Sequence, residues 1–203
     1  MPTTQQAIRE ARRTDTRARL LHAAWALARE HGVAAVSLRE LATEVGMRQP
    51  SLYTYFESKN GLYDLMYEAA GQELLTRATA LSPTADPVAD LRAIVGVLVE
   101  FSTEDVARHD LVFHRPIPGY EPSAEAAAPA QRFRELLVRR VESAGITDPG
   151  DIDVVTAAIA GLVEAQIASE PTGDRWTRHV DRVLDALRTG LAPRKPKKRA
   201  ATR

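Results

Sequence analysis

The chain has 203 residues, of which 44% are hydrophobic, so it can form a packed core in one domain or in two small ones. It contains no cysteine, which excludes disulfides and thiolate metal sites. The N-terminus lacks the apolar core of a signal peptide and no run of 18 apolar residues occurs, so we expect a cytoplasmic protein with no membrane partner.

The formal net charge of zero hides an uneven distribution. Residues 1–60 carry 9 Lys and Arg against 6 Asp and Glu, residues 61–193 carry 12 against 21, and residues 194–203 carry 6 against none. Basic ends around an acidic middle are typical of a chain whose ends alone approach nucleic acid. Residues 194–203 also contain proline, and we expect a disordered basic tail there.

Residues 1–15 have no sustained apolar period and include several arginines, which predicts a mobile basic arm. Such an arm either reaches a DNA minor groove or is a solvated terminus without a role. A threonine or aspartate at positions 14–16 is expected to cap the first helix, which runs to about His31 and ends at Gly32.

Residues 37–66 contain the strongest local signals. Ser37 can cap a helix, with Glu40 three residues later in a capping box, and apolar residues then recur at helical spacing. Gly46 follows where a left-handed residue ends a helix, and Pro50 suits the start of the next one. Two helices joined by so short a turn form a helix-turn-helix.

The second helix of this motif is short, and only Leu52 and Phe56 are spaced to face inward. The remaining side chains are mostly hydrogen-bond donors, which suit phosphates on the flanks and base edges in the middle. A third helix starts at Ser58. It places Lys59 at the positive end of the helix dipole, where a bound phosphate would offset the unfavourable charge.

Residues 17–66 resemble the tetracycline-repressor-like (TetR/AcrR) transcriptional regulators, and the run LYTYFESKNGL is the specific part of the match. The resemblance implies an all-α fold, with a three-helix head containing the helix-turn-helix at residues 1–60 and a larger helical ligand-binding and dimerisation domain at residues 61–193. It implies DNA contacts by Arg39, Arg48, Gln49, Pro50, Ser51, Tyr53, Tyr55 and Lys59.

Within that set, the resemblance implies that Tyr53, Tyr55 and Lys59 hold phosphates. Arg48, Gln49 and Ser51 would face the bases. Three structural alternatives stay open: Tyr55 as a core aromatic, Arg39 as a solvated charge, and Lys59 as an ordinary surface lysine.

In the rest of the chain, the third helix continues beyond residue 66 and connects the head to the body. Gly71 either interrupts this helix or marks a close contact. Residues 81–87 contain two prolines and break the helical pattern. Asp86 then caps a long apolar helix that is expected to extend to about Arg108.

Residues 109–129 contain four prolines and are expected to be irregular. Long irregular segments are often binding loops, and the alternative is a proline-rich surface connection. Polarity and position suggest six effector-binding candidates: Phe101, Phe113, His114, Tyr120, Phe133 and Gln166.

Three more helices are predicted after residue 129, at about 130–143, from a cap at Asp148 or Asp151 to before Pro171, and at about 174–189. The helix before Pro171 is rich in alanine and glycine, which let another helix approach closely. In the family, the last two long helices form the homodimer. An ordinary helix pair within one subunit is the alternative.

The sequence shows no metal-ligand spacing, no glycine-rich phosphate loop and no nucleophile elbow, so we expect neither an enzyme nor a cofactor. The predicted function is a ligand-responsive repressor that binds double-stranded DNA at a palindromic operator as a homodimer and is released by a small-molecule effector. An activator of the same fold and a helical protein-interaction module without specific DNA binding remain alternatives.

Overall fold

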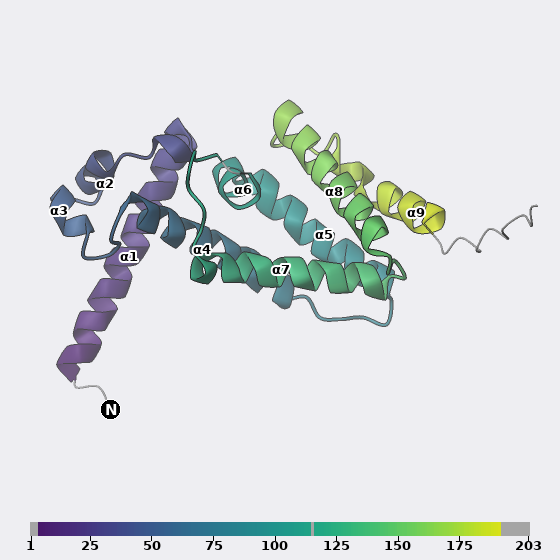
Figure 1. Cartoon of the computed structure of the whole chain (residues 1–203), viewed down its shortest axis with the longest axis horizontal. Coiled ribbons are helices and arrows are strands. Elements are labelled where there is room, and N and C mark those ends of the chain that lie inside the picture. The colour runs from purple at the N-terminus through teal and green to yellow at the C-terminus, as the bar shows by residue number, and fades with distance from the viewer. Residues whose placement is uncertain (1–3, 115, 192–203) are drawn as a thin grey trace, which may run out of the picture. The chain divides into compact units, whose positions relative to one another are not determined.

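The computed structural model describes residues 4–114 and 116–191, and within these ranges it contains nine α-helices and no strand (Figure 1). The helices are α1 Thr4–His31, α2 Leu38–Glu44, α3 Gln49–Leu52, α4 Lys59–Thr79, α5 Pro87–Glu104, α6 Val106–Phe113, α7 Ala124–Ser143, α8 Pro149–Ser169 and α9 Val180–Gly190. Short 3₁₀ helices cover Val33–Ala35 and Thr177–His179. The all-α expectation is confirmed. The predicted basic tail, residues 194–203, lies outside the described residues.

The helices form two compact units. The first contains the chain up to Ala80 together with Phe101–Phe133, and the second contains Leu81–Glu100 together with the chain from Arg134 onward. Helices α5 and α7 each pass from one unit into the other. The boundary expected between residues 60 and 61 falls inside α4, so α4 shares a unit with the helices of the predicted head. That the head binds DNA, and that the body binds the effector and forms the dimer, stays a prediction.

The core of the first unit is formed by the apolar faces of its N-terminal helices. Six side chains from four helices are fully buried: Leu20 and Ala24 of α1, Leu41 of α2, Leu52 of α3, and Leu62 and Met66 of α4. Helix α1 contacts both α2 and α4. Because each helix buries one stripe, its opposite face is free to carry polar side chains.

Helix α1 starts earlier than expected. Residues 4–15, predicted as part of a mobile arm, are helical. The Thr14 and Thr16 hydroxyls donate to the carbonyls of Glu10 and Arg12, at 3.0 and 2.9 Å, as in a helix interior and not as caps. The apolar period was missing because this part of α1 is largely exposed. Its residues are mostly good helix formers, which is sufficient to extend a helix that is already anchored.

The long helix expected to reach Arg108 is two helices. Helix α5 ends at Glu104 and Asp105 caps α6, accepting a hydrogen bond from the backbone N–H of Arg108 at 3.2 Å. The apolar period continues across this break, so periodicity alone did not reveal it. The cap at Asp86 is confirmed, because its carboxylate accepts from the Val88 N–H at 2.9 Å.

The proline-rich segment is shorter than predicted. Residues 109–113 belong to α6 and residues 124–129 to α7, so among the described residues of this segment only 114 and 116–123 lie outside a helix. Pro129 lies inside α7, although its ring removes one backbone donor from the helix. Pro129 is buried, as are Ala126, Ala130 and Phe133 on the same helix, so packing of this face compensates for the lost bond.

Gly71 marks a close approach of α4 and α7. A Cβ at this position would lie 2.9 Å from the backbone nitrogen of Ala130 and 3.2 Å from its Cβ. Gly71→Ala is therefore expected to lower the free energy of unfolding by about 1–3 kcal/mol, measured by chemical denaturation. Gly96→Ala is the control, because a Cβ on Gly96 meets nothing within 4 Å. Equal stabilities for the two variants would contradict this contact.

The second unit contains the pair α8 and α9, which contact each other. The cap of α8 is Asp148, whose carboxylate accepts from the backbone N–H groups of Gly150 at 2.9 Å and Asp151 at 3.2 Å. Although the sequence has no run of 18 apolar residues, α8 is long and apolar enough, by length and composition alone, to cross a membrane, with a mean hydropathy of 1.5. Only 28% of this stretch is buried within the single chain, which leaves an apolar surface.

Candidate DNA interface

The helix-turn-helix forms from the local signals predicted for it. The Ser37 hydroxyl accepts a hydrogen bond from the Glu40 N–H at 3.4 Å and caps α2. After α2, Gly46 adopts φ 69°, a left-handed conformation that favours glycine. Helix α3 then begins at Gln49 with Pro50 in its first turn. The turn between α2 and α3 is therefore short and specified by backbone chemistry.

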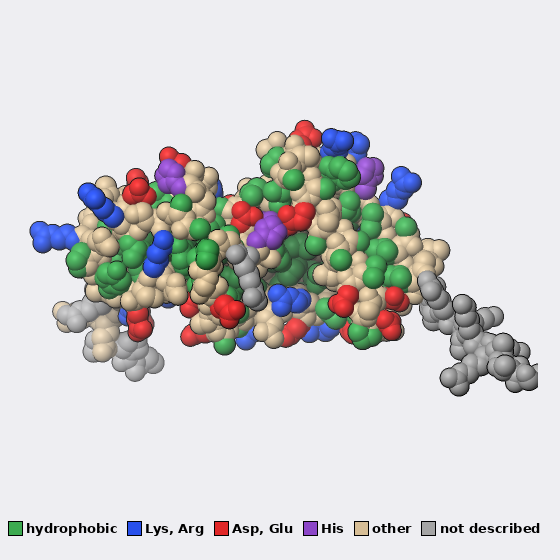
Figure 2. Space-filling view, turned by 45° about the horizontal axis from the view of Figure 1, so that its top comes forward, with side chains coloured by type: hydrophobic (Ala, Val, Ile, Leu, Met, Phe, Trp, Pro, Cys, Tyr) green, Lys and Arg blue, Asp and Glu red, His purple; other side chains and the backbone are tan. Residues whose placement is uncertain are grey.

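Helix α3 is anchored on one side and exposed on the other. Leu52 is fully buried and Phe56 is 5% exposed, so the two residues predicted to face inward do so. The predicted contact residues at positions 48–51 are all exposed, and Tyr53 is 47% exposed. Lys and Arg side chains project from the end of the molecule where α2 and α3 lie (Figure 2). A short helix held by its buried side can present its other side to a groove of DNA.

The remaining predicted contacts lie around α3. Arg39 is exposed on α2, and Tyr55 is half-buried just after α3. Lys59 is exposed at the start of α4, which Ser58 caps by accepting from the Gly61 N–H at 3.1 Å. The Lys59 ammonium lies 5.5 Å from the centre of the Tyr63 ring and donates to the Ala34 carbonyl at 3.5 Å, a long contact that leaves it available to an anion.

Four of the six effector candidates lie on or next to helices α5 to α7. Phe101 lies on α5, Phe113 on α6 and Phe133 on α7, and His114 directly follows α6. The Phe101 and Phe113 rings meet edge to face at 6.4 Å, and Phe113 and His114 each contact the ring of His109. Phe101 and Phe133 are buried, whereas Phe113 and His114 are exposed. The structure therefore brings Phe101, Phe113 and His114 into one aromatic cluster.

Tyr120 lies against a different surface, on α4. Its hydroxyl donates to the Asp64 carboxylate at 2.8 Å, and its ring lies 5.3 Å from that of Tyr63. Burial raises the pKa of Tyr120, and hydrogen bonding to Asp64 raises it further, so the phenol stays protonated. The backbone N–H of Ser123 donates to the same carboxylate oxygen at 3.2 Å. These contacts fasten the segment between α6 and α7 to α4.

Gln166 has a structural position in the second unit. It is fully buried, and its side-chain carbonyl accepts from the backbone N–H groups of Trp176 at 2.7 Å and Thr177 at 3.4 Å. Its amide also donates to the Glu170 carbonyl. Gln166 thus holds the connection between α8 and α9, and it belongs to a different unit from the other five candidates.

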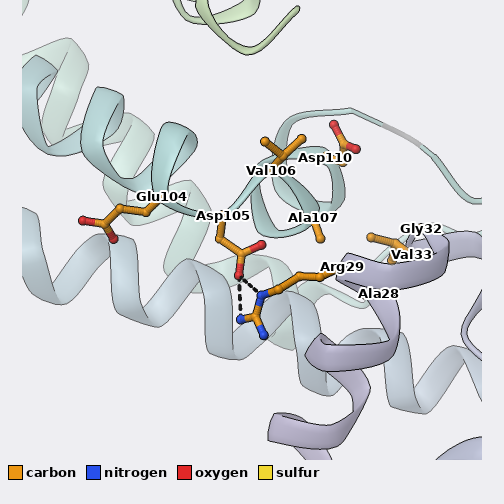
Figure 3. Close-up of a pocket in the computed structure, with 9 residues that line it drawn as sticks. All are labelled: Ala28, Arg29, Gly32, Val33, Glu104, Asp105, Val106, Ala107 and Asp110. Atoms are coloured by element: carbon orange, nitrogen blue, oxygen red, sulfur yellow. Dashed lines mark hydrogen bonds and ion pairs between the residues drawn. The ribbon is translucent and has the colours of Figure 1, made fainter. Parts of the chain in front are cut away.

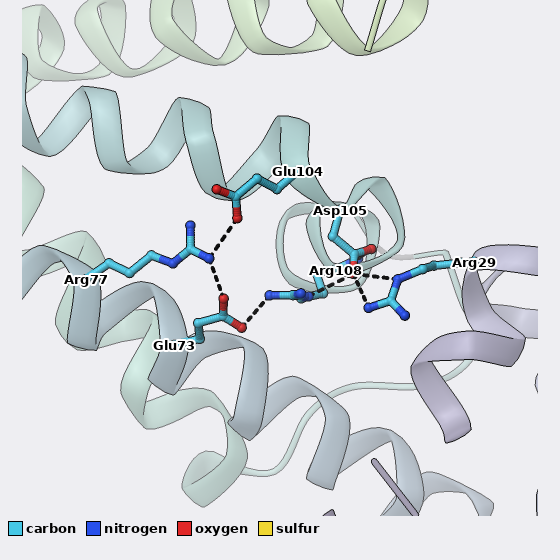
Figure 4. Close-up of polar contacts among 6 residues, drawn as sticks. All are labelled: Arg29, Glu73, Arg77, Glu104, Asp105 and Arg108. Atoms are coloured by element: carbon cyan, nitrogen blue, oxygen red, sulfur yellow. Dashed lines mark hydrogen bonds and ion pairs between the residues drawn. The ribbon is translucent and has the colours of Figure 1, made fainter. Parts of the chain in front are cut away.

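A chain of ion pairs connects α1 with α4, the end of α5 and α6 (Figure 4). The Arg29 guanidinium donates twice to one oxygen of Asp105, at 2.9 and 2.7 Å, and Arg108 donates to the same oxygen at 2.8 Å. Arg108 also pairs with Glu73. Arg77 continues the chain, pairing with Glu73 at 2.6 Å and with Glu104 at 2.7 Å. The six residues are Arg29, Glu73, Arg77, Glu104, Asp105 and Arg108, called the ion-pair chain below.

Asp105 is the centre of the ion-pair chain. Its side chain is only 2% exposed, and it borders a pocket of about 310 Å³ between the end of α1 and the start of α6 (Figure 3). Burial by itself raises the pKa of this carboxyl, but the hydrogen bonds from Arg29 and Arg108 outweigh that effect and hold the pKa of Asp105 below its ordinary value. The carboxylate is therefore ionised at neutral pH.

The ion-pair chain could not be predicted from the sequence. Arg29 and Asp105 are 76 residues apart, and both occur in stretches whose apolar pattern is purely helical. One local signal was available: an aspartate three residues before Arg108 can cap a helix. Its pairing with Arg29 depends on how α6 packs against α1.

Part of the sequence is similar to known bacterial regulatory proteins. Residues 20–66 match the model of the bacterial regulatory proteins of the tetR family. The HTH-type transcriptional regulator Rv1816 of Mycobacterium tuberculosis is 31% identical over 106 residues, which are 49% of this chain and 44% of that protein. The chain thus matches less than half the length of this curated relative.

Two solved structures share the fold over most of the chain. The TetR family transcriptional regulator PfmR from Thermus thermophilus has a TM-score of 0.63 and 24% identity, covering 86% of this chain and 100% of PfmR. The multidrug binding protein EbrR, solved with imidazole, has a TM-score of 0.59 and 20% identity, covering 90% of this chain and 93% of EbrR. The matched segment 20–66 contains the end of α1, then α2, the turn, α3 and the start of α4, and this segment belongs to the tetR family of bacterial regulatory proteins.

Proposed function

We propose that the chain is a DNA-binding transcriptional regulator in which α3 enters the major groove of a palindromic operator. The observation that carries this proposal is the exposed polar side of α3, held in place by the buried Leu52 and Phe56. Arg48, Gln49 and Ser51 would contact base edges, while Tyr53, Tyr55 and Lys59 would hold phosphates. This role is one of binding and not of catalysis, and it would be performed in the cytoplasm.

The two contact types are expected to respond differently to substitution. Gln49→Ala should weaken binding by about 1–3 kcal/mol, mainly on the preferred sequence, because an amide can pair with a base edge. Tyr53→Phe should weaken binding equally on preferred and random duplexes, because the lost hydroxyl contact is to a phosphate. Fluorescence anisotropy with both duplexes measures the two effects. An equal loss on both duplexes for Gln49→Ala would remove the base-reading role from Gln49.

Homodimerisation through α8 and α9 is part of the proposal. Val155, Ile159 and Val163 are buried on one side of α8. The opposite side presents exposed small residues: Ala157, Ala160, Gly161 and Ala168. A Cβ on Gly161 would meet nothing within 4 Å, so this side has no packing partner in the described chain. A small, apolar, self-complementary helix face suits a two-fold interface.

In such a dimer, two α3 helices about 34–36 Å apart would enter successive major grooves. We infer that a small-molecule effector in the body changes this spacing and releases the operator, which makes the protein a repressor. A coupling free energy of about 1–3 kcal/mol is enough for a several-fold to hundredfold change in affinity. The ion-pair chain supports this inference, because it joins α1 of the head to α4 and α6.

The effector site is proposed around Phe101, Phe113 and His114, where aromatic rings and a polar tip are in contact. Such a mixture suits an apolar ligand with a polar group. That EbrR, a multidrug binding protein, shares the fold is compatible with a ligand-binding body.

Selection of binding sites from random duplex DNA tests the function. The wild-type protein is expected to enrich a palindrome, and Tyr53→Ala combined with Lys59→Ala is expected to lose that enrichment. If a folded dimer enriches no sequence, the protein should be unfolded, washed free of any bound effector, refolded and tested again. Failure of the refolded protein would favour a helical protein-interaction module.

A further inference from the structure

A second cleft lies beside α3, between it and the extended N-terminal part of α1. It has a volume of about 380 Å³ and is lined by five residues, Arg12, Arg13 and Thr16 of α1, with Thr54 and Tyr55 after α3. Only Tyr55 among them belongs to the predicted DNA contacts. The cleft exists because α1 continues as a helix to Thr4, which carries the two arginines alongside the helix-turn-helix.

The two arginines differ from the next two on the same helix. Arg17 pairs with Glu68 at 3.1 Å, and Arg19 donates to the Val45 carbonyl at 3.1 Å. Arg12 and Arg13 are exposed, and no ion pair or side-chain hydrogen bond joins either guanidinium to the described part of the chain. Their positive charge is therefore not neutralised by a partner within this unit.

The chemistry of the lining selects an anion. No carboxylate lines the cleft. The Thr16 and Thr54 hydroxyls already donate to backbone carbonyls, at 2.9 and 2.8 Å. The guanidiniums of Arg12 and Arg13 and the hydroxyl of Tyr55 remain as donors, and all three suit an acceptor with several negatively charged oxygens.

We propose that this cleft binds a phosphate of the DNA backbone, so that α1 forms a second anchor next to α3. The inference rests on the proposed function and extends it to residues that neither the family resemblance nor the helix-turn-helix contains. Phosphate contacts position a protein on the duplex and carry no sequence information directly. Arg12 and Arg13 should therefore increase affinity on every sequence without changing the preferred one.

The test compares the salt dependence of duplex binding for wild type, R12Q/R13Q and a control, R132Q/R139Q. The control removes the same charge from two exposed arginines of α7. Glutamine is a good helix former, and circular dichroism checks that α1 is retained. With one phosphate bound in each cleft, the slope of log affinity against log salt should flatten by about 0.9 for each protomer in R12Q/R13Q. The loss should be equal on operator and random duplexes.

Other results would contradict the cleft proposal alone or the proposed function as well. An unchanged slope in R12Q/R13Q, or an equal change in the control, would overturn the cleft proposal while leaving the proposed function intact. A loss confined to the preferred sequence would also overturn it, because it would assign base contacts to these arginines. If the wild-type protein, refolded free of any bound effector, still binds no duplex, the proposed function is wrong and the cleft proposal falls with it. If R12Q/R13Q loses helix, R12A/R13A replaces it, because alanine is the strongest helix former, and the same flattening of the slope is expected.

Discussion

Replacing Asp105 by alanine is expected to lower the free energy of unfolding by roughly 3 kcal/mol, which is a large part of the stability of a typical domain. The substitution removes the acceptor shared by Arg29 and Arg108 and also the N-cap of α6. Arg108 is only 20% exposed, so its charge would lose most of its compensation. Arg29 is half-exposed and can turn to water, which keeps the loss below that of a fully buried pair.

Chemical denaturation followed by circular dichroism measures this loss. Asp110→Ala is the matched control, because Asp110 lies on the same helix but its side chain is 40% exposed and paired only near the surface with His114. The control should change stability by less than about 1 kcal/mol. A similar loss in both variants would show that burial at Asp105 adds nothing to the ion-pair chain.

The contribution of Asp105 to the free energy of unfolding is expected to decrease as the pH falls into the acidic range. Because the pKa of Asp105 is lower in the folded protein than its ordinary value, the contribution is complete above about pH 4. It is lost as the pH falls through the lower, folded-state pKa. Asp105→Asn removes the charge and keeps a capping oxygen. The stability difference between wild type and Asp105→Asn should therefore narrow as the pH falls below about 4, and a constant difference would contradict the assignment.

Ala157→Arg is expected to dissociate the proposed dimer and to lower affinity for the palindrome by about 10²–10⁴-fold. The arginine would face its own copy across the two-fold axis, where like charges repel and small residues leave no room. Each monomer would then hold one half-site, and the second half-site would no longer add to affinity.

Sedimentation equilibrium and operator binding measure the two parts of this prediction together. Ala93→Arg is the control, since it places the same side chain on an exposed position of α5. Both variants should fold, because neither position is buried. An Ala157→Arg protein that remains dimeric with wild-type affinity would remove this face of α8 from the interface.

Sequence alone determined the elements whose signals are local. The caps at Ser37 and Ser58, and the left-handed Gly46, lie within a few residues of the groups they bond. For α8 the sequence left Asp148 and Asp151 as alternatives, and the structure places the cap at Asp148. The spacing of Leu52 and Phe56 predicts that both face inward, because so short a helix has few apolar positions. The exposure of the predicted contacts on α3 followed from the same argument.

Tertiary structure decided what depends on contacts between distant segments. The prolines were expected to exclude helix up to residue 129, but the buried face of α7 compensates for Pro129. The break at Asp105 was hidden because apolar periodicity continues across it. The helical start of α1 was missed because an exposed helix needs no apolar period.

The candidate sites divide in the same way. The surface of α3 follows from one local motif, whereas residue type and position alone suggest the effector candidates. The structure brings Phe101, Phe113 and His114 together but separates Tyr120 and Gln166 from them. The ion-pair chain and the cleft at Arg12 and Arg13 depend on where α1 lies against α6 and α3. Hydrophobic packing sets that placement, and no short stretch of sequence encodes it.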